Sequence, residues 1–226
     1  MRKEAASKGW KVLLVMLIAC FACISLSGFS AKADTLGYDN FALSYYSDSS
    51  VSIKFNTGYV MVDGVKRHID GRVEILDQNM NVLAQKEADS YANIPFSSAM
   101  NTVYYYRVTP FVTVGGVKRD IGEPSPVKAF STIILKNKSS KSDRRLRVRC
   151  PKVNGVTNVK IMMSRSPYGG FHKIGQVKPG KTSRKMKKLP LNVTVYYYPE
   201  PVLASGVPCE NVKVNSVRVY RVWRRG

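Results

Sequence analysis

Apolar and polar residues alternate in short runs along this chain, at the spacing that β-strands require. From Val51 to Phe55 every second residue is apolar, so successive side chains would point alternately to a core and to solvent. The five residues from Thr102 to Tyr106 occur again from Thr194 to Tyr198. Aromatic and β-branched residues in this order favour a strand. A repeat at about one small domain's length predicts two copies of one β-sandwich.

Turn-forming residues divide the first half into hairpins. Asp63-Gly64 lies between β-forming flanks, the polar run from Asp77 to Asn81 separates another pair of strands, and Gly115-Gly116 supplies a third turn. No segment shows helical periodicity. The pattern predicts an all-β chain of two immunoglobulin-like sandwiches, over residues 34–133 and 134–226.

The first 33 residues have the parts of a secretory signal. Basic residues precede an apolar run from Val12 to Leu26, and a small-x-small site ends at Ala33. The apolar run is shorter than the roughly 20 residues of a membrane span. We therefore expect cleavage between Ala33 and Asp34, a secreted or extracellular location, and no membrane span in the mature chain.

Two alternative predictions for the processing of the N-terminus remain open. Leu17-Ile18-Ala19-Cys20 resembles the lipobox of bacterial lipoproteins, in which the cysteine becomes the lipidated first residue. That cleavage would leave the apolar residues from Phe21 to Leu26 on the mature chain, which disfavours it. An uncleaved anchor is the remaining alternative.

Charge separates the two halves. The chain carries +21 at pH 7, but residues 34–133 hold 9 Lys and Arg against 11 Asp and Glu, a net of −2. Residues 134–226 hold 22 Lys and Arg against 3 Asp and Glu, a net of +19. This imbalance indicates an anionic partner for the second half. Solubility alone is the other explanation.

The strand from Tyr104 to Val108 resembles the sixth strand of fibronectin type III domains. The approach to the last strand, from Gly122 to Val127, resembles the family's G-x-x-S motif, and the resemblance covers residues 38–132. It implies that the leading tyrosine caps the preceding corner. It also implies that the side chains of Tyr104, Tyr106, Val108 and Pro110 point into the core. The side chains of Tyr105 and Arg107 would face solvent.

The second half resembles the same family over residues 134–222. Leu146 to Ile161 has the layout of its second and third strands, in the form found in secreted and surface proteins of Gram-positive bacteria. Two positions depart from the family pattern. Cys150 stands where the family has a core tryptophan, and Arg184 stands where it has an aromatic residue. Loss of the tryptophan removes a large apolar side chain.

Two cysteines remain after signal removal. Cys20 and Cys23 leave with the signal, whereas Cys150 and Cys209 stay in the secreted chain. The resemblance places both at one end of the sandwich. We expect a Cys150–Cys209 disulfide that closes a loop of about 60 residues and contributes roughly 4 kcal/mol.

Cations alternate with apolar residues at two places in the second half. Leu146, Val148 and Cys150 would share one face of a strand, and three arginines would share the other, about 7 Å apart. The resemblance makes this strand a neighbour of the one that contains Lys185-Met186-Lys187. The candidate polyanion-binding residues are Arg145, Arg147, Arg149, Lys185 and Lys187. An ordinary solvated sheet face is the alternative.

No reactive constellation accompanies the strands. The two histidines, His68 and His172, fall in different halves, and Asp63, Asp70 and Asp77 lie at predicted turns or strand ends. Calcium binding by those aspartates stays as a minor alternative. We expect no cofactor, no metal and no catalysis.

These features favour a non-catalytic secreted or cell-surface adhesion module whose basic domain binds wall teichoic acid or an acidic glycan. Nucleic acid is a weaker candidate because no aromatic arrangement suits base stacking. No sorting motif is found, since Leu189-Pro190 is not followed by Thr-Gly, so retention at the wall would be non-covalent. The alternatives are a structural spacer that contacts envelope proteins and an accessory module of a secreted carbohydrate-active system.

Overall fold

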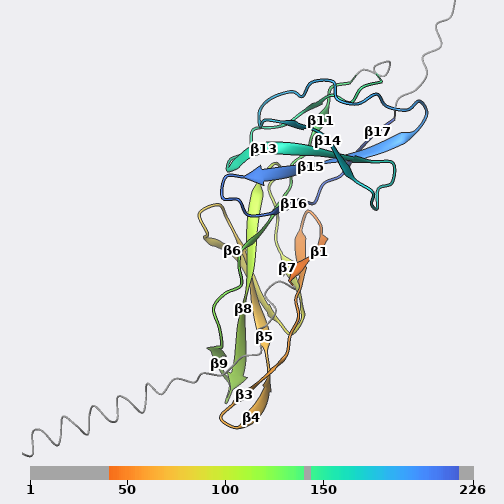
Figure 1. The fold of residues 1–226 in the computed structure, drawn as a ribbon. Coiled ribbons are helices and arrows are strands. Elements are labelled where there is room, and N and C mark those ends of the chain that lie inside the picture. Colours follow the sequence, from red (N-terminus) through yellow and green to blue (C-terminus); the bar gives the residue numbers. More distant parts are fainter. Residues whose placement is uncertain (1–40, 140–143, 219–226) are drawn as a thin grey trace, which may run out of the picture.

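The computed structural model describes residues 41–139 and 144–218, and these residues form strands and loops without a helix (Figure 1). The predicted signal peptide and its cleavage between Ala33 and Asp34 lie outside the described residues. Within residues 41–139 and 144–218 no helix is long and apolar enough to cross a membrane. The all-β prediction is confirmed.

The first half forms a sandwich of two antiparallel sheets. One sheet has the order β1-β2-β7, and the other has the order β6-β5-β8-β10 with β9 beside β8. The first sheet consists of β1 (Ala42–Tyr46), β2 (Ser50–Lys54) and β7 (Tyr91–Pro95). The second consists of β5 (Asp70–Leu76), β6 (Val82–Ala88), β8 (Val103–Val114), β9 (Val117–Asp120) and β10 (Lys128–Ser131). A separate ribbon of β3 (Tyr59–Val62) and β4 (Val65–His68) lies between β2 and β5 in sequence.

The three predicted hairpins of the first half are confirmed as β3–β4, β5–β6 and β8–β9. Asp63 and Gly64 both have positive φ, 52° and 74°, as a two-residue hairpin turn requires. The corner before β8 is also as expected, because the backbone N–H of Ala99 donates to the hydroxyl of Tyr104 at 2.7 Å. At the approach to β10, the Ser125 hydroxyl accepts the N–H of Val108 at 2.9 Å.

The second half repeats this arrangement, although its first two strands are shorter than those of the first half. One sheet has the order β14-β13-β15-β17, and the other pairs β11 with β12. The segment 181–189 continues that second sheet beyond β12 without being a regular strand. The strands are β11 (Lys136–Asn137), β12 (Val148–Arg149), β13 (Val156–Ser164), β14 (His172–Val177), β15 (Thr194–Leu203), β16 (Cys209–Asn211) and β17 (Asn215–Arg218).

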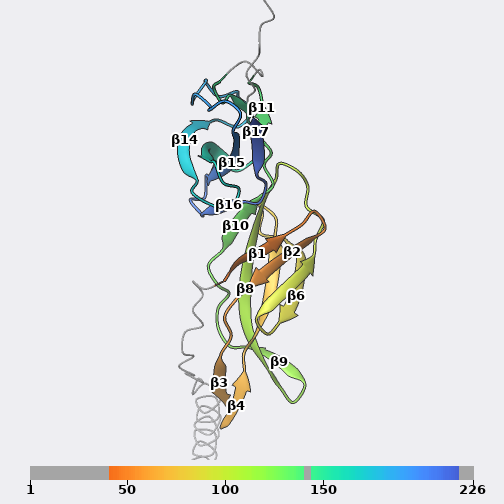
Figure 2. The ribbon, with the colours of Figure 1, turned by 90° about the vertical axis from the view of Figure 1, so that its right-hand side faces the viewer.

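The two halves are joined through more than a linker. Strand β16 of the second half pairs in parallel with β10 and so extends a sheet of the first half (Figure 2). Asn211 fixes this junction: its side-chain oxygen accepts from the Ser131 hydroxyl at 2.6 Å and from the Ile133 N–H at 3.2 Å. The predicted division between residues 133 and 134 falls between β10 and β11, and buried Ile133 contributes to a core cluster that includes side chains from both halves.

The junction corrects one predicted orientation. Tyr105 was expected to face solvent but is 6% exposed. It lies in a row of directly opposed residues across four neighbouring strands, and that row packs into the core cluster of the second half. The row is Leu76, Tyr105, Ala129 and Cys209. The expectation failed because the outer sheet face of an isolated sandwich meets water, whereas here the second half covers it.

The repeated five residues are used in opposite orientations by the two sandwiches. In β8, Tyr104 and Tyr106 face the core of their own sandwich. In β15 it is Tyr197 that is buried in the core of the second half, at 2% exposure, while Tyr196 and Tyr198 are half-buried. A shift of one residue moves every side chain to the other face of a strand. The repeat therefore identifies the same strand in each sandwich, but the tyrosines that point into the core differ between the two copies.

Candidate functional site

The predicted basic strand has the expected alternation. Leu146, Val148 and Cys150 are fully buried, whereas the three arginines between and before them are exposed. Backbone pairing joins this strand to segment 181–189, since the Leu146 N–H donates to the Lys187 carbonyl at 3.0 Å and the Ser183 N–H donates to the Val148 carbonyl at 2.8 Å. All five candidate cations are exposed on these two segments. They are Arg145, Arg147, Arg149, Lys185 and Lys187.

The structure adds cations that the sequence analysis missed. Lys188 lies directly opposite Arg145, and Lys136 of β11 lies directly opposite Arg149, so these pairs share a sheet face. Three adjacent segments, 136–138, 145–149 and 184–188, thus carry nine exposed basic side chains, which we call the basic surface. Its members are Lys136, Lys138, Arg145, Arg147, Arg149, Arg184, Lys185, Lys187 and Lys188. The alternation in Leu135-Lys136-Asn137-Lys138 was the available signal.

A local irregularity explains how neighbouring lysines are all exposed. Met186 N–H donates to the Leu146 carbonyl, and the register of the two paired segments shifts by two residues between the bridge at Lys188 and the bridge at Thr182. Such an irregularity resembles a β-bulge, in which one strand has more residues than the stretch of the partner strand that it faces. Met186 is half-buried against the core, while Lys185 and Lys187 on either side are exposed.

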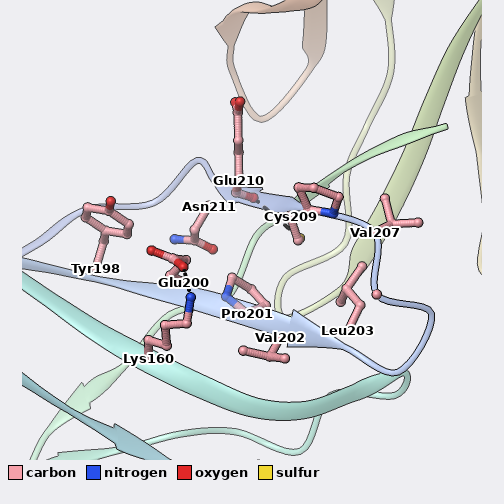
Figure 3. Close-up of a pocket in the computed structure, with 12 residues that line it drawn as sticks. Lys160, Tyr198, Glu200, Pro201, Val202, Leu203, Val207, Cys209, Glu210 and Asn211 are labelled. Carbon is pink, nitrogen blue, oxygen red and sulfur yellow. Dashed lines mark hydrogen bonds and ion pairs between the residues drawn. The ribbon is translucent and has the colours of Figure 1, made fainter. Parts of the chain in front are cut away.

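Carboxylates are absent from the three segments of the basic surface. Glu200 and Glu210, the two carboxylates in residues 144–218, instead line an open pocket of about 620 Å³ beside β15 and β16 (Figure 3). There the Lys160 ammonium contacts the Glu200 carboxylate at 2.5 Å. Burial raises the pKa of the neighbouring Tyr198 hydroxyl, and the charges of Glu200 and then Glu210 raise that pKa further. Glu200 and Glu210 therefore belong to segments other than those of the basic surface.

The two cysteines are both buried, but the predicted bridge between them is not formed in this structure. Cys150 follows β12, where its N–H donates to the Lys181 carbonyl at 2.9 Å. Cys209 is in β16, which pairs with β10 of the first half instead of remaining in a free loop at the end of the sandwich. Burial raises the pKa of the Cys150 thiol to about 11. The pKa of the Cys209 thiol is raised to about 12, and burial is the largest cause of that shift.

The aspartates and histidines that could have bound a metal instead stabilise a turn or lie on the surface. Hydrogen bonds from the side chain and N–H of Asn81 and from the N–H of Asn79 lower the pKa of Asp77 and hold its turn. His68 contacts Asp70 at 3.1 Å, and His172 is exposed and contacts the Lys187 ammonium at 3.3 Å. Among the described residues, no three His, Cys, Asp or Glu side chains are grouped to hold a metal.

Comparisons with known proteins are informative only in part. No family model matches the sequence, and no curated protein sequence matches it. Among solved structures, the chain is similar to a two-domain fibronectin type III segment of chicken tenascin, with 15% identity over 79% of this chain and 95% of that chain, and a TM-score of 0.29. It is also similar to the BSP domain of a biofilm-associated protein, with 10% identity over 76% of this chain and 28% of that chain, and a TM-score of 0.26.

The strand order defines the fold of each half. In each half, a sheet of the first, second and fifth strands of the sandwich faces a sheet of the third, fourth, sixth and seventh. The protein is thus an all-β protein of two successive fibronectin type III-like sandwiches. Its distinguishing features are the basic surface on the second sandwich and the strand that the second sandwich adds to the first.

Proposed function

We propose that the protein is a non-catalytic, secreted or cell-surface binding module whose basic surface contacts polyanions, such as wall teichoic acid or an acidic glycan. The observation that supports this most is the density of the basic surface. Nine exposed Lys and Arg side chains lie on three paired segments that contain no Asp or Glu. A sheet face that served only solubility would gain more from mixed charges.

The spacing of the cations suits a linear polyanion. Arg145, Arg147 and Arg149 recur every second residue along one strand, so neighbouring guanidinium groups begin about 7 Å apart. Arginine presents a planar fork of donors that can bind phosphate or carboxylate oxygens in pairs. A chain of repeating phosphates or uronates would therefore meet several donors in succession.

A salt series on the whole mature chain, residues 34–226, tests this proposal with wall teichoic acid and heparin as probes. Each cation that neutralises a charge on a flexible polyanion contributes about 0.7 to the log–log salt slope. Five contacts give a slope near −3.5 and nine give about −6. With five contacts, affinity falls roughly a hundredfold between about 50 and 200 mM salt.

A charge-matched pair of triple variants separates the basic surface from net charge. R145S/R147S/R149S should flatten the slope by about two units, whereas K54S/K86S/R119S, which removes three exposed cations of the first half, should leave it unchanged. Circular dichroism and thermal melting would verify that both variants fold. Equal flattening by the two variants would show that net charge alone governs binding, and an unchanged slope in the arginine variant would exclude these arginines.

The junction favours a second function, that of a spacer. Core side chains of both halves form one cluster, and β16 continues a sheet of the first half. Such an interface holds two sandwiches in one orientation better than a flexible linker does. As a spacer, the protein would hold the basic surface at a set distance from an envelope protein bound to the first half, and a co-purifying protein partner would support this role.

A further inference from the structure

The β3–β4 ribbon projects from the end of the first half that lies away from the second half (Figures 1 and 2). It forms a two-stranded sheet of its own, in which β3 pairs only with β4 among the described strands. A small core of Val60, Ile69 and Val112 holds the ribbon against β8. One long edge of the ribbon, that of β3, therefore has no neighbouring strand in the described chain.

The residues with unpaired backbone groups on that edge can be identified from the register. Val62 lies opposite Val65 across the two-residue turn, and the Ile69 N–H donates to the Gly58 carbonyl at 2.9 Å. Hydrogen-bonded and non-hydrogen-bonded pairs alternate in an antiparallel ladder. The N–H and C=O groups of Tyr59 and Met61 consequently point away from β4, toward the free edge.

The β3 edge lacks the charged residues that protect several other sheet edges of the molecule. β3 reads Tyr-Val-Met-Val and contains no charged residue, as is also true of the edge strands β1 and β7, whereas the edge strands β6, β9 and β14 all contain lysine. Lysine on an edge strand discourages pairing with another chain, and an uncharged edge invites it. Tyr59 and Met61 are also 60% and 58% exposed, so apolar side chains accompany the open backbone groups.

Neighbouring side chains hold the exposed tyrosine in a defined position. The Tyr59 ring lies edge-on to His68 with centroids 5.3 Å apart, and the Lys66 ammonium lies 4.5 Å from the Tyr59 ring centre. A tyrosine that is already ordered loses little conformational entropy on contact with a partner. The strand thus presents a fixed apolar surface beside its free backbone groups.

We infer that the β3 edge is the site where two copies of the chain associate, through antiparallel pairing of β3 with β3 of the partner. The distribution of charge selects this end of the molecule. Residues 34–133 carry a net of −2 and residues 134–226 carry +19, so two copies repel least when they meet at their near-neutral ends, far from both basic halves. A two-fold axis at Val60 would pair Tyr59 with Met61 of the partner subunit and form four N–H···O=C bonds.

The interface is small and the association is correspondingly weak. Stable complexes bury at least about 1,200 Å², and a strand of four residues with few flanking contacts supplies less, so we expect dissociation constants on the order of 10⁻⁵ to 10⁻⁴ M. Each mature copy carries a net of +17. Because salt screens the repulsion between like-charged copies, dimerisation should strengthen as salt rises, which is opposite in sign to polyanion binding.

Sedimentation velocity of residues 34–226 from about 5 to 500 μM, at low and high salt, tests the inference without any polyanion. M61K should weaken dimerisation at least tenfold because a lysine then lies at the two-fold pairing site. V117K adds the same charge at an equally exposed apolar residue of neighbouring β9 and should dimerise like the wild type, as should M61L. Equal thermal midpoints would show that the variants fold.

Amide hydrogen exchange distinguishes this dimer from other occupants of the edge. The amides of Tyr59 and Met61 should become protected as the protein concentration rises and should lose that protection in M61K. Protection that does not depend on concentration would mean that the chain's own residues cover the edge, and would overturn the inference. A monomer at every concentration, or a dimer that V117K disrupts as strongly as M61K, would also overturn it.

Discussion

Strands β8 and β15 contain the same five residues, yet their sheets bury them differently. In β8 both faces are covered at this point, since Tyr104 and Tyr106 pack inside the first sandwich and Tyr105 packs beneath the second half. In β15 only Tyr197 of the three tyrosines is fully buried. Composition identifies the strand in each case, but the layer that covers each face decides which side chain belongs to a core.

The two halves also differ in how they treat charge. In the first half, two cations on the sheet of β5, β8 and β9 are paired with carboxylates: Arg107 contacts Glu74 at 2.6 Å and Arg72 contacts Asp120 at 2.8 Å. Segments 136–138, 145–149 and 184–188 of the second half contain no carboxylate that could serve in this way. The same sandwich architecture thus carries a neutralised sheet face in one half and a basic surface in the other.

The largest expected effect on stability comes from truncating the two buried tyrosines, Tyr105 and Tyr197. Y105A and Y197A should each lower the free energy of unfolding by about 3 kcal/mol, because each removes a large side chain from a buried site. Chemical denaturation followed by circular dichroism would measure the loss. Y45A, which truncates a tyrosine that is 59% exposed, should change the free energy by less than about 0.5 kcal/mol.

The result for Tyr105 distinguishes two descriptions of the first half. If its sheet face met water, as the sequence predicted, Y105A would resemble Y45A. A loss comparable to that of Y197A would instead show that the second half covers this face in solution. A loss confined to Y197A would contradict the shared core.

The sequence predicts each sandwich well because the signals for strands and turns are local. Alternation located β12 and its exposed arginines, and Asp63-Gly64 located the β3–β4 turn. Contacts between the halves depend on residues distant in sequence, such as Cys209 opposite Ala129, and no local pattern encodes them. For the same reason Lys136 and Lys188 were missed, since their membership in the basic surface depends on pairing across strands.

A smaller effect is expected from the junction residue Asn211. N211A removes the acceptor for the Ser131 hydroxyl and the Ile133 N–H and leaves them without their buried partner. We expect a loss of about 2 kcal/mol. The wild type should unfold in one calorimetric transition, and N211A should separate the transitions of the two halves. Two transitions in the wild type would show that the halves unfold independently.

The smallest expected effect on the folded protein concerns its thiols. Burial raises the pKa of Cys150 to about 11 and is the main cause that raises that of Cys209 to about 12, whereas an unfolded thiol ionises near pH 8.5. Thiolates are the reactive species, so native protein at pH 8 should not react with iodoacetamide. In denaturant without reductant it should gain two adducts, and C150S or C209S should gain one.

The same shifts set a pH dependence whose sign follows from linkage. Because both pKa values are higher in the folded state, the folded chain holds the thiol protons that the unfolded chain releases above about pH 8.5. The stability from these two groups is therefore complete below that pH and declines as pH rises toward 11 and 12. The C150S and C209S variants should each show a shallower decline than the wild type over that window. Denatured protein that gains adducts only after reduction would instead reveal a disulfide, and the second half would then differ from the first by a covalent link across its core.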